Sequence, residues 1–561
     1  MTHAAGPDGA PVIIAGGGPV GMVLALELGR RDVPCVLLND RPGPSPQPKA
    51  NATSPRSMEH LRRLGISERF RVTGLPPDHP TDVTYVTRLN GYELARQRLP
   101  CWRDAVAETA IGSGPWASPE PAHRGSQIFL ERVLFERLAD FPAIDRRFGW
   151  RLDGFEARAD GVTVHAVEVE TGKEASLEAD WLVGCDGPSS GVRKGLGIDY
   201  EGDAGIERPM MGGTMLAVHL RLDRRSDDGP WPERSWQFWT VNPEIRTLMI
   251  AIDGADEFVI HIAMKEGETP SQADVRALVE QALGGPVVRE IISATPWTAG
   301  FRLLAQRYRV DRVFLAGDAA HLFTPTGGLG MNTGVEDAVN LGWKLAAVAK
   351  GWGGSGLLDS YEADRRPVAA RNLVFSKAFA DSVGRTPASP AIETESEEGR
   401  AERARIGAHL LEHARREFLI PGIHLGYRYE GSAIIVPDGS AAPPDPPNSY
   451  APTARPGHRA PHIWLEPGLA LYDRLGAEFT LLRLDPRGGG GDADAAKGIG
   501  DAFAVAGVPM TMLEVAVDGA RDLYGADLAL VGPDQHVVWR GDAPPDDLVG
   551  LAETVTGGGG R

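Results

Sequence analysis

Residues 312–345 read RVFLAGDAAHLFTPTGGLGMNTGVEDAVNLGWKL, and this stretch decides the fold of the chain. The apolar run Val313–Ala316 predicts a buried strand, which Gly317 and Asp318 follow directly. Three glycines come next, and from about Asn332 apolar residues recur at helical spacing. Because a helix N-terminus carries free N–H groups and partial positive charge, this strand, acid, glycine loop and helix suit an anionic or electron-rich ligand.

A second unit of this kind lies near the N-terminus. It consists of the strand Val12–Ala15, a G-x-G-x-x-G motif formed by Gly16, Gly18 and Gly21 with Pro19 inside it, the helix Met22–Gly29 and the strand Cys35–Leu38. In this context the motif is typical of dinucleotide binding, because its glycines permit a tight turn and close approach of a pyrophosphate. Asn39 stands where an acidic ribose ligand is expected and Asp40 follows it, and the sequence leaves open which of them contacts the ribose.

A third apolar run, Trp181–Gly184, is followed by Cys185, Asp186 and Gly187. Ligands of open α/β sheets bind at the carboxyl ends of the strands, so we expect Asp186 and Asp318 at one edge of one sheet. The chain is therefore predicted to have an α/β fold with a Rossmann-like dinucleotide-binding domain.

Composition excludes several classes of partner. The chain has 561 residues, enough for two or three domains, and a net charge of −18, which argues against nucleic acid and anionic membranes as partners. Its three cysteines are far apart and odd in number, so neither a disulfide framework nor a metal site is predicted. The N-terminus lacks the basic region of a signal peptide, and we expect a cytoplasmic protein. Whether it forms a homo-oligomer stays open.

Together the motifs resemble the fingerprints of single-component (class A) FAD-dependent aromatic hydroxylases. The matching segments are GGGPVG at 16–21, CDGPSSGVR at 185–193 and AGDAAHLFTPTGGLGMNTGVEDAVNLGWKL at 316–345, within a likeness over roughly residues 10–380. The resemblance looks closest to phenol, 2,4-dichlorophenol and 2-hydroxybiphenyl hydroxylases. It implies that FAD, reduced by NADH or NADPH, reacts with O2 to a flavin C4a-hydroperoxide that hydroxylates a phenolic or other electron-rich aromatic substrate.

The motifs and the resemblance also indicate cofactor contacts. The candidates are Gly16, Gly18, Pro19, Gly21, Asn39, Asp40, Lys49, Gln127, Asp186, Asp318, Pro325, Gly328, Gly330, Met331 and Asn332. By resemblance the first glycines would hold the pyrophosphate, Asp318 the ribityl chain, and residues 325–332 the isoalloxazine, while Asp186 lies in a motif used for FAD and NAD(P)H. Lys49 is equally compatible with an ordinary solvated charge.

The substrate side of the site has fewer signals. Trp236, Phe238 and Trp239 could wall an aromatic pocket, although each also suits an ordinary core. Asn51 stands where the related enzymes tend to carry a His or Asp as proton acceptor, and an amide cannot take a proton. Another group or water therefore removes the substrate proton, or the substrate is not a simple phenol.

No catalytic residue is assigned from the sequence. Pro325 and His321 are the candidates nearest to the flavin, and a structural hydrogen bond within the loop is the favoured role of His321. Two alternatives to ring hydroxylation stay open. The same flavin and oxygen chemistry could serve epoxidation or Baeyer–Villiger oxidation of a biosynthetic intermediate, which Asn51 favours, or the fold could bind a partner without catalysis, which the intact Asp318 motif disfavours.

Three units are predicted along the chain. They are a FAD-binding domain in residues 1–385 (10–200 and 300–385) with an inserted mixed, substrate-binding sheet at about 75–122 and 200–300, a helical and proline-rich linker at 386–450, and a domain at 451–561 that resembles the thioredoxin-like C-terminal domain of the same hydroxylases. The last unit has no cysteine, which excludes thiol redox chemistry there. We further expect loop with short strands over 75–122, a surface helix over Ser396–Phe418 and a flexible loop at Gly488–Gly491.

Overall fold

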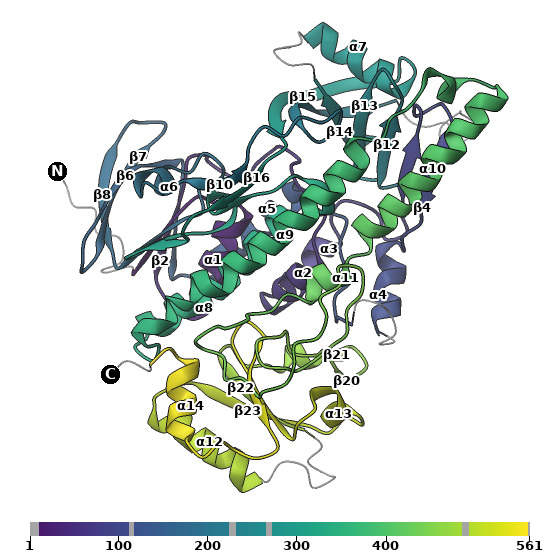
Figure 1. Cartoon of the computed structure of the whole chain (residues 1–561). Helices are drawn as coiled ribbons and strands as arrows, with labels where there is room; N and C mark the ends of the chain where they lie inside the picture. Colours follow the sequence, from purple (N-terminus) through teal and green to yellow (C-terminus); the bar gives the residue numbers. More distant parts are fainter. Residues whose placement is uncertain (1–10, 111–116, 224–231, 265–271, 485–492, 559–561) are drawn as a thin grey trace.

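The computed structural model describes residues 11–110, 117–223, 232–264, 272–484 and 493–558. The predicted loop Gly488–Gly491 lies outside these described residues. Figure 1 shows three regions: a sheet with the N-terminal strands at the left, a second sheet at the top, and the C-terminal unit at the bottom in yellow. The long helices α8 (Leu329–Ala349) and α9 (Ser360–Gly384) run between these regions.

The first region is a six-stranded sheet that carries the glycine motifs. Its order is β17 (Arg309–Val310), β18 (Val313–Leu315), β9 (Trp181–Gly184), β1 (Val12–Ala15), β2 (Cys35–Asn39) and β5 (Ile144–Phe148). All neighbours are parallel except β17 and β18. Ala15 and Leu315 both pair with Gly184, so the three segments that follow these strands emerge together. The expected meeting of three distant motifs at one sheet edge is thus confirmed.

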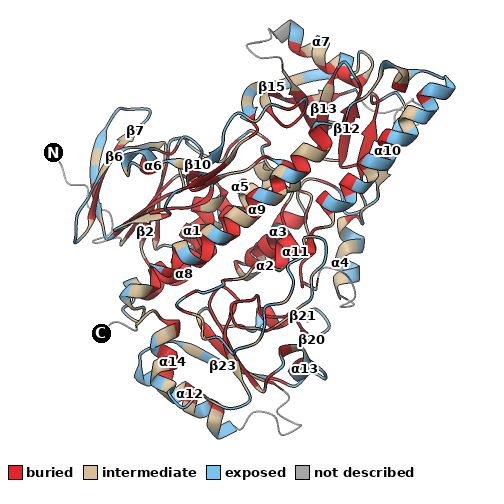
Figure 2. Cartoon of the chain, in the orientation of Figure 1, coloured by how far each residue is buried: buried red, intermediate tan, exposed pale blue. Residues whose placement is uncertain are grey.

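Two helices begin at this edge, and each begins three residues earlier than predicted. Helix α1 (Pro19–Gly29) begins at Pro19 instead of Met22, because proline suits the first helical turn, where no N–H partner is needed. Helix α8 begins at Leu329 instead of Asn332 and follows a 3₁₀ turn, Thr326–Gly328. Figure 2 shows both helices coloured mainly as buried, and α1 packs against α8.

The second region is the expected mixed sheet, with seven strands. Its order is β15 (Val288–Ala299), β11 (Gly213–Leu222), β14 (Glu257–Ala263), β13 (Arg246–Ala251), β12 (Gln237–Val241), β3 (Val83–Val86) and β4 (Glu93–Gln97). Only the β12–β3 pair of this sheet is parallel, and the other neighbours are antiparallel. The apolar residues of this sheet form a second core, separate from the core of the six-stranded sheet.

Two expectations beside this sheet need correction. Residues 75–122 contain, besides β3 and β4, the helix α4 (Trp102–Ala110). The prolines concealed it, although none falls between Pro100 and Pro115, which leaves room for a helix. The helix expected over Ser396–Phe418 is observed as α10 (Glu397–Phe418), but its expected role as a surface brace is incomplete. Its Ile406, Leu410 and Ala414 are buried in the second core, and its end reaches the cavity described below.

The other elements connect and cover these sheets. They are the strands β6 (Trp150–Ala157), β7 (Val162–Glu168) and β8 (Glu174–Ala179), the strands β10 (Tyr200–Asp203), β16 (Arg302–Ala305) and β19 (His321–Leu322), the pair β20 (Trp464–Glu466) and β21 (Leu469–Ala470), and the helices α2 (Pro55–Arg63), α3 (Ser67–Arg71), α5 (Gln127–Arg137), α6 (Gly191–Gly195), α7 (Gln272–Leu283) and α11 (Pro421–Leu425). Within the described residues, no helix is both long enough and apolar enough to cross a lipid bilayer.

The C-terminal unit has the expected thioredoxin-like arrangement. Its elements are β22 (Phe479–Leu484), α12 (Ala493–Val505), β23 (Met510–Val515), α13 (Ala520–Tyr524), β24 (Leu528–Val531), β25 (Val537–Gly541) and α14 (Leu548–Val555). The sheet order is β23–β22–β24–β25, with β22 and β23 parallel and the other neighbours antiparallel. The predicted strands and the hairpin of β24 and β25 are confirmed.

Candidate functional site

A cavity of about 1420 Å³ lies between the two large sheets. One side is formed by the segments that follow β1, β9 and β18, and the other by the mixed sheet and the end of α10. Pockets for a single ligand typically measure roughly 300–1,000 Å³. The cavity is therefore large enough for two ligands side by side, one at each wall.

Most of the predicted cofactor residues line this cavity. They are Gly16, Gly18, Pro19, Asn39, Asp40, Lys49, Gln127, Asp186, Asp318, Pro325, Gly328, Gly330 and Met331. Gly21 and Asn332 do not. A Cβ at Gly21 would lie 1.9 Å from the Gly16 carbonyl oxygen, so this glycine permits close packing of α1 on the loop. Asn332 instead accepts a hydrogen bond from Ser54 N (2.8 Å) and donates to Ala52 O (3.0 Å).

The first glycine loop is shaped for close approach of a ligand. Gly16 has φ +110°, and a Cβ there would lie 2.2 Å from the Cys185 carbonyl oxygen. A Cβ at Gly18 would meet nothing within 4 Å, so the loop is open on its cavity side. Asn39 Oδ1 accepts a hydrogen bond from Gly17 N (3.1 Å), which holds the loop in place. Because Asn39 is engaged in this way, Asp40 is the better candidate for a ribose contact.

Two acids end the neighbouring strands, as predicted. Asp186 Oδ2 accepts a hydrogen bond from Val192 N (3.0 Å), while its buried Oδ1 has no partner among the described residues. The Asp318 side chain is exposed to the cavity. Burial raises the pKa of the Asp318 carboxyl, and the nearby His321 and Lys49 partly oppose this. Unsatisfied, partly desolvated carboxylates of this kind suit hydroxyl groups of a ligand, which donate hydrogen bonds to them.

Tyr200 and Arg193 were not singled out from the sequence, yet they support this edge. The Tyr200 hydroxyl donates to the backbone oxygen of Asp318 (2.7 Å), and the Arg193 guanidinium lies 4.0 Å from the Tyr200 ring centroid. Both side chains line the cavity. Arg193 belongs to the motif at 185–193, but no local pattern connects Tyr200 with a strand that lies more than a hundred residues further along the chain.

The glycine loop before α8 turns the N-terminus of this helix toward the cavity. Gly327 and Gly328 have φ values of +75° and +64°, which side chains rarely adopt. Gly330 and Met331, in the first turn of α8, line the cavity. A helix of 21 residues presents its unpaired N–H groups and dipole here, which favours negative charge on a ligand beside it.

His321 has a structural position. Its side chain is fully buried and does not line the cavity, and its Nε2 lies 2.7 Å from Asp337 Oδ2. The same carboxylate accepts hydrogen bonds from Gly317 N (3.2 Å) and from Arg365 Nε (2.9 Å). This network fixes the Gly317–Asp318 corner, which agrees with the structural role favoured for His321. The other catalytic candidate, Pro325, does line the cavity.

Aromatic and amide side chains cover the opposite wall. Trp236 and Trp239 line the cavity as expected, but Phe238 points to the other face of β12 and packs in the second core. Gln237, which the sequence did not single out, lines the cavity and donates from Nε2 to Asn51 Oδ1 (3.3 Å). Trp239 Nε1 donates to Gln237 Oε1 (3.0 Å). These bonds join Asn51 to the mixed sheet.

His261 is a further titratable group on this wall, and its ring packs edge-on against Trp297 with centroids 5.5 Å apart. Burial lowers the pKa of His261 to about 4, so this imidazole is neutral and weakly basic at neutral pH. None of the three polar side chains described so far on this wall is therefore a strong general base. They are Asn51, Gln237 and His261.

The residues at the strand-end edge fit a flavin nucleotide. They supply a glycine loop for phosphates, acids without full hydrogen bonding for the sugar and ribityl hydroxyls, and a helix N-terminus for the ring system. The opposite wall fits a flat, apolar ligand.

Comparison with known proteins agrees with this geometry. The family described as "FAD binding domain" matches residues 9–376, and the family "Aromatic-ring hydroxylase, C-terminal" matches residues 453–558. The chain is 34% identical to the FAD-dependent monooxygenase apdD of Emericella nidulans over 563 residues, covering 95% of this chain and 87% of that protein.

Solved structures give the same result. RebC-10x, solved in native form and with K252c bound, matches with a TM-score of 0.85 at 33% identity, covering 98% of this chain and 100% of that one. Aklavinone-11 hydroxylase in a ternary complex with FAD and aklavinone matches with a TM-score of 0.79 at 28% identity, covering 99% and 100%. These titles name K252c and aklavinone as the bound molecules, and the expected closeness to the phenol hydroxylase subgroup stays a prediction.

Proposed function

The chain belongs to the FAD-dependent aromatic-ring hydroxylases, which are flavin-dependent aromatic monooxygenases, and we propose that it hydroxylates a multi-ring, electron-rich aromatic substrate with NAD(P)H as reductant. The observation that carries this proposal is the cavity of about 1420 Å³ with its two unlike walls. One wall suits a dinucleotide and the other a flat aromatic ring system. Aklavinone in the related ternary complex supports a substrate with several rings.

The residues at the strand-end edge would hold FAD. Gly16 and Gly18 would approach the pyrophosphate, Asp40 a ribose, and Asp318 the ribityl chain, while Pro325, Gly328, Gly330 and Met331 would lie along the isoalloxazine. When bound, FAD supplies the oxygen chemistry, with electrons from NADH or NADPH. The N-terminus of α8 would stabilise negative charge at the isoalloxazine, because its N–H groups are fixed before any reaction occurs.

The mixed sheet would position the substrate and exclude water. Trp236, Trp239 and Trp297 present flat apolar surfaces to the cavity. Asn51 is held by Gln237, and its amide can hydrogen-bond a substrate hydroxyl but cannot remove its proton. Asn51 therefore cannot ionise the substrate, and an electron-rich ring or another group would supply the activation.

Asn51, in place of a His or Asp, supports a second candidate, epoxidation or Baeyer–Villiger oxidation with the same cofactor, since neither reaction starts from a phenolate. Product analysis after turnover in ¹⁸O-labelled O2 separates the two. A new hydroxyl on an intact ring supports hydroxylation, whereas a labelled epoxide or a ring-expanded lactone supports the second candidate.

The main test uses purified protein. We expect it to be yellow, with about one FAD per chain, and to oxidise NADH or NADPH faster when a multi-ring phenol is added. Product and hydrogen peroxide are measured together, because peroxide without product indicates uncoupled oxidation. A preparation that binds no FAD, or an Asp318→Ala variant with undiminished FAD affinity and turnover, would count against the assigned site.

A further inference from the structure

Arg124, one of several arginines that line the large cavity, has no counter-ion in the described part of the chain. Arg124 lies in the connection between α4 and α5 and lines the substrate side of the large cavity. Its guanidinium carbon sits 4.7 Å from the centroid of the Trp236 ring, and Trp236 in turn packs edge-on against Phe418. In the described part of the chain, Arg124 forms no hydrogen bond and no ion pair. The Arg124 side chain is partly buried, and charges that are partly withdrawn from water usually have a partner, so this arrangement requires an explanation.

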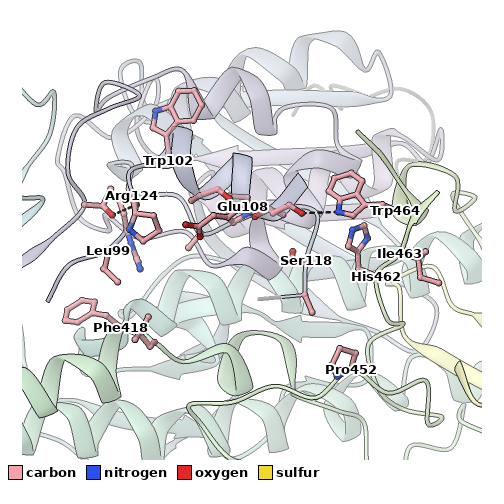
Figure 3. Close-up of a pocket in the computed structure, with 18 of the residues that line it drawn as sticks. Leu99, Trp102, Glu108, Ser118, Arg124, Phe418, Pro452, His462, Ile463 and Trp464 are labelled. Atoms are coloured by element: carbon pink, nitrogen blue, oxygen red, sulfur yellow. Dashed lines mark hydrogen bonds between the residues drawn. The ribbon is translucent and has the colours of Figure 1, made fainter. Parts of the chain in front are cut away.

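A second cavity adjoins this position. It measures about 540 Å³, lies between segment 97–124 and the C-terminal unit, and shares Arg124 and Phe418 with the large cavity. Figure 3 shows Arg124 in this second cavity with Leu99 and Phe418 on the same side, and Trp464 and His462 on the other. Arg124 therefore stands where the substrate wall meets a route toward the protein surface.

The nearby carboxylates do not neutralise Arg124. Glu417 lines the large cavity, but its Oε1 accepts a hydrogen bond from Gly327 N (2.8 Å) and its Oε2 lies 2.8 Å from His413 Nε2. Glu108 and Asp518 line the second cavity but are exposed to solvent, and neither pairs with Arg124. Burial alone lowers the pKa of Arg124, to about 10, which leaves the guanidinium charged at neutral pH.

We propose that Arg124 binds a carboxylate carried by the aromatic substrate, while the adjoining ring system lies along Trp236 and the mixed sheet. The inference rests on the proposed function, because it names the chemical class of the substrate for that same cavity. A guanidinium presents two parallel donors that match the two oxygens of a carboxylate, and its stacking on Trp236 fixes the plane of this fork. The unpaired positive charge of Arg124 beside the Trp236 ring selects an aromatic monoanion over its neutral analogue.

The test compares two probes with the same ring system, the anionic 6-hydroxy-2-naphthoic acid and its uncharged methyl ester. Their binding to the full-length, FAD-loaded protein is measured by titration calorimetry at neutral pH. We expect the wild type to prefer the acid about tenfold or more, and Arg124→Met to weaken binding of the acid by about 10- to 100-fold, because a charge-assisted bidentate pair is lost. Binding of the ester should change by less than about threefold.

Two further variants sharpen this comparison. Arg124→Lys keeps the charge but loses the planar fork, so it should recover only part of the preference for the acid. Arg98→Met is the matched control, because Arg98 lines only the second cavity, where it pairs with Glu233 (2.8 Å), and it should leave both affinities unchanged. FAD content and thermal unfolding of each variant verify that the fold is intact.

Equal binding of acid and ester by the wild type, or equal losses for both probes in Arg124→Met, would overturn the carboxylate site. Binding is read independently of turnover, so the two proposals fail separately. Hydroxylation of both probes without any preference for the acid would leave the hydroxylase proposal standing and remove the role of Arg124. Loss of the preference in Arg124→Met without hydroxylation of either probe would support Arg124 and count against the proposed reaction on these substrates.

Discussion

Two arginines, the fully buried Arg56 and the partly buried Arg124, show how differently one side chain is used in two regions of the molecule. Arg56 lies where the C-terminal unit meets the FAD-binding region and donates to Glu59 Oε2 (2.8 Å), Gln535 Oε1 (2.6 Å) and Asp534 O (2.5 Å). Arg124 lies at the cavity and has only the Trp236 face beside it. A paired buried charge joins two parts of a fold, whereas an unpaired one is available to a ligand.

The interface around Arg56 is a closed ionic cluster. Glu59 is buried and receives hydrogen bonds from Arg56 and also from Arg459 (Nε to Oε2, 3.0 Å), a residue of the C-terminal unit. Burial by itself raises the pKa of Glu59, but Arg459 and Arg56 lower it overall. For Arg56, burial lowers the pKa, and Tyr427 and Glu59 more than compensate for this. Each charge in the cluster is therefore stable only while the others are present.

The largest expected effect comes from breaking this cluster. Glu59→Gln should lower the free energy of unfolding by about 3–5 kcal/mol, because two arginines would then share an uncharged partner while they stay buried. Chemical denaturation of the FAD-loaded protein measures this change. Arg69→Ala is the control, since the Arg69–Glu136 pair is about half exposed and should contribute no more than about 0.5 kcal/mol. A loss of less than about 1 kcal/mol in Glu59→Gln would show that the cluster does not stabilise the interface.

The second prediction concerns pH and follows from the lowered pKa of Glu59. A carboxyl whose pKa is lower in the folded state stabilises the fold fully above its unfolded value of 4.5, and this stabilisation is lost as the pH falls through the lower folded value. The difference in unfolding free energy between wild type and Glu59→Gln should thus be constant near neutral pH and shrink in acid below 4.5. A difference that grows toward acid pH would contradict the assignment.

A third, smaller effect is expected at the glycine loop. There a single neutral hydrogen bond holds the structure, whereas ion pairs hold the cluster around Arg56. Asn39→Ala removes the acceptor for Gly17 N, which should weaken FAD binding by about 1 kcal/mol, or roughly fivefold. Fluorescence titration of the flavin-free protein with FAD measures this affinity. Asp40→Asn is the matched variant, and a greater loss there than in Asn39→Ala would support Asp40 as the ribose contact.

The smallest effect completes the comparison of the two arginines. Arg124→Met should change the free energy of unfolding by less than about 1 kcal/mol, because the lost stacking on Trp236 is offset by relief of an unpaired, desolvated charge. Denaturation under the same conditions as for Glu59→Gln gives the measurement. A loss as large as that of Glu59→Gln would mean that Arg124 is a structural residue, and its proposed role toward substrate would need revision.

Much of the cofactor side was predictable because its requirements are local. Gly16, Gly18 and Gly328 stand in short motifs, and the positive φ angles of Gly16 and Gly328 demand glycine there. Asp186 and Asp318 follow apolar strands directly, so their place at the sheet edge could be inferred from the order of residues alone. The elements β22, β23 and the β24–β25 hairpin were likewise evident from their apolar runs and turn residues.

The substrate side was less predictable, because its contacts join distant parts of the chain. Alternation in β12 shows that Phe238 faces away from Gln237 and Trp239, but only strand pairing decides which face lines the cavity. The bond between Gln237 and Asn51 spans 186 residues of sequence. The helix α4 was missed because prolines on both sides obscured its pattern.

Sequence alone determined the α/β fold and the dinucleotide-binding edge, since both depend on periodicity and on short motifs whose physical demands lie within a few residues. The flavin and the thioredoxin-like unit followed from the resemblance to the aromatic hydroxylases. Only the tertiary structure decided which polar and charged groups are paired. Arg56 and Gln535 are 479 residues apart in sequence and hydrogen-bonded, while Arg124 is left without a partner in the described chain. Pairing depends on the three-dimensional position of a group, and burial makes its presence or absence energetically decisive.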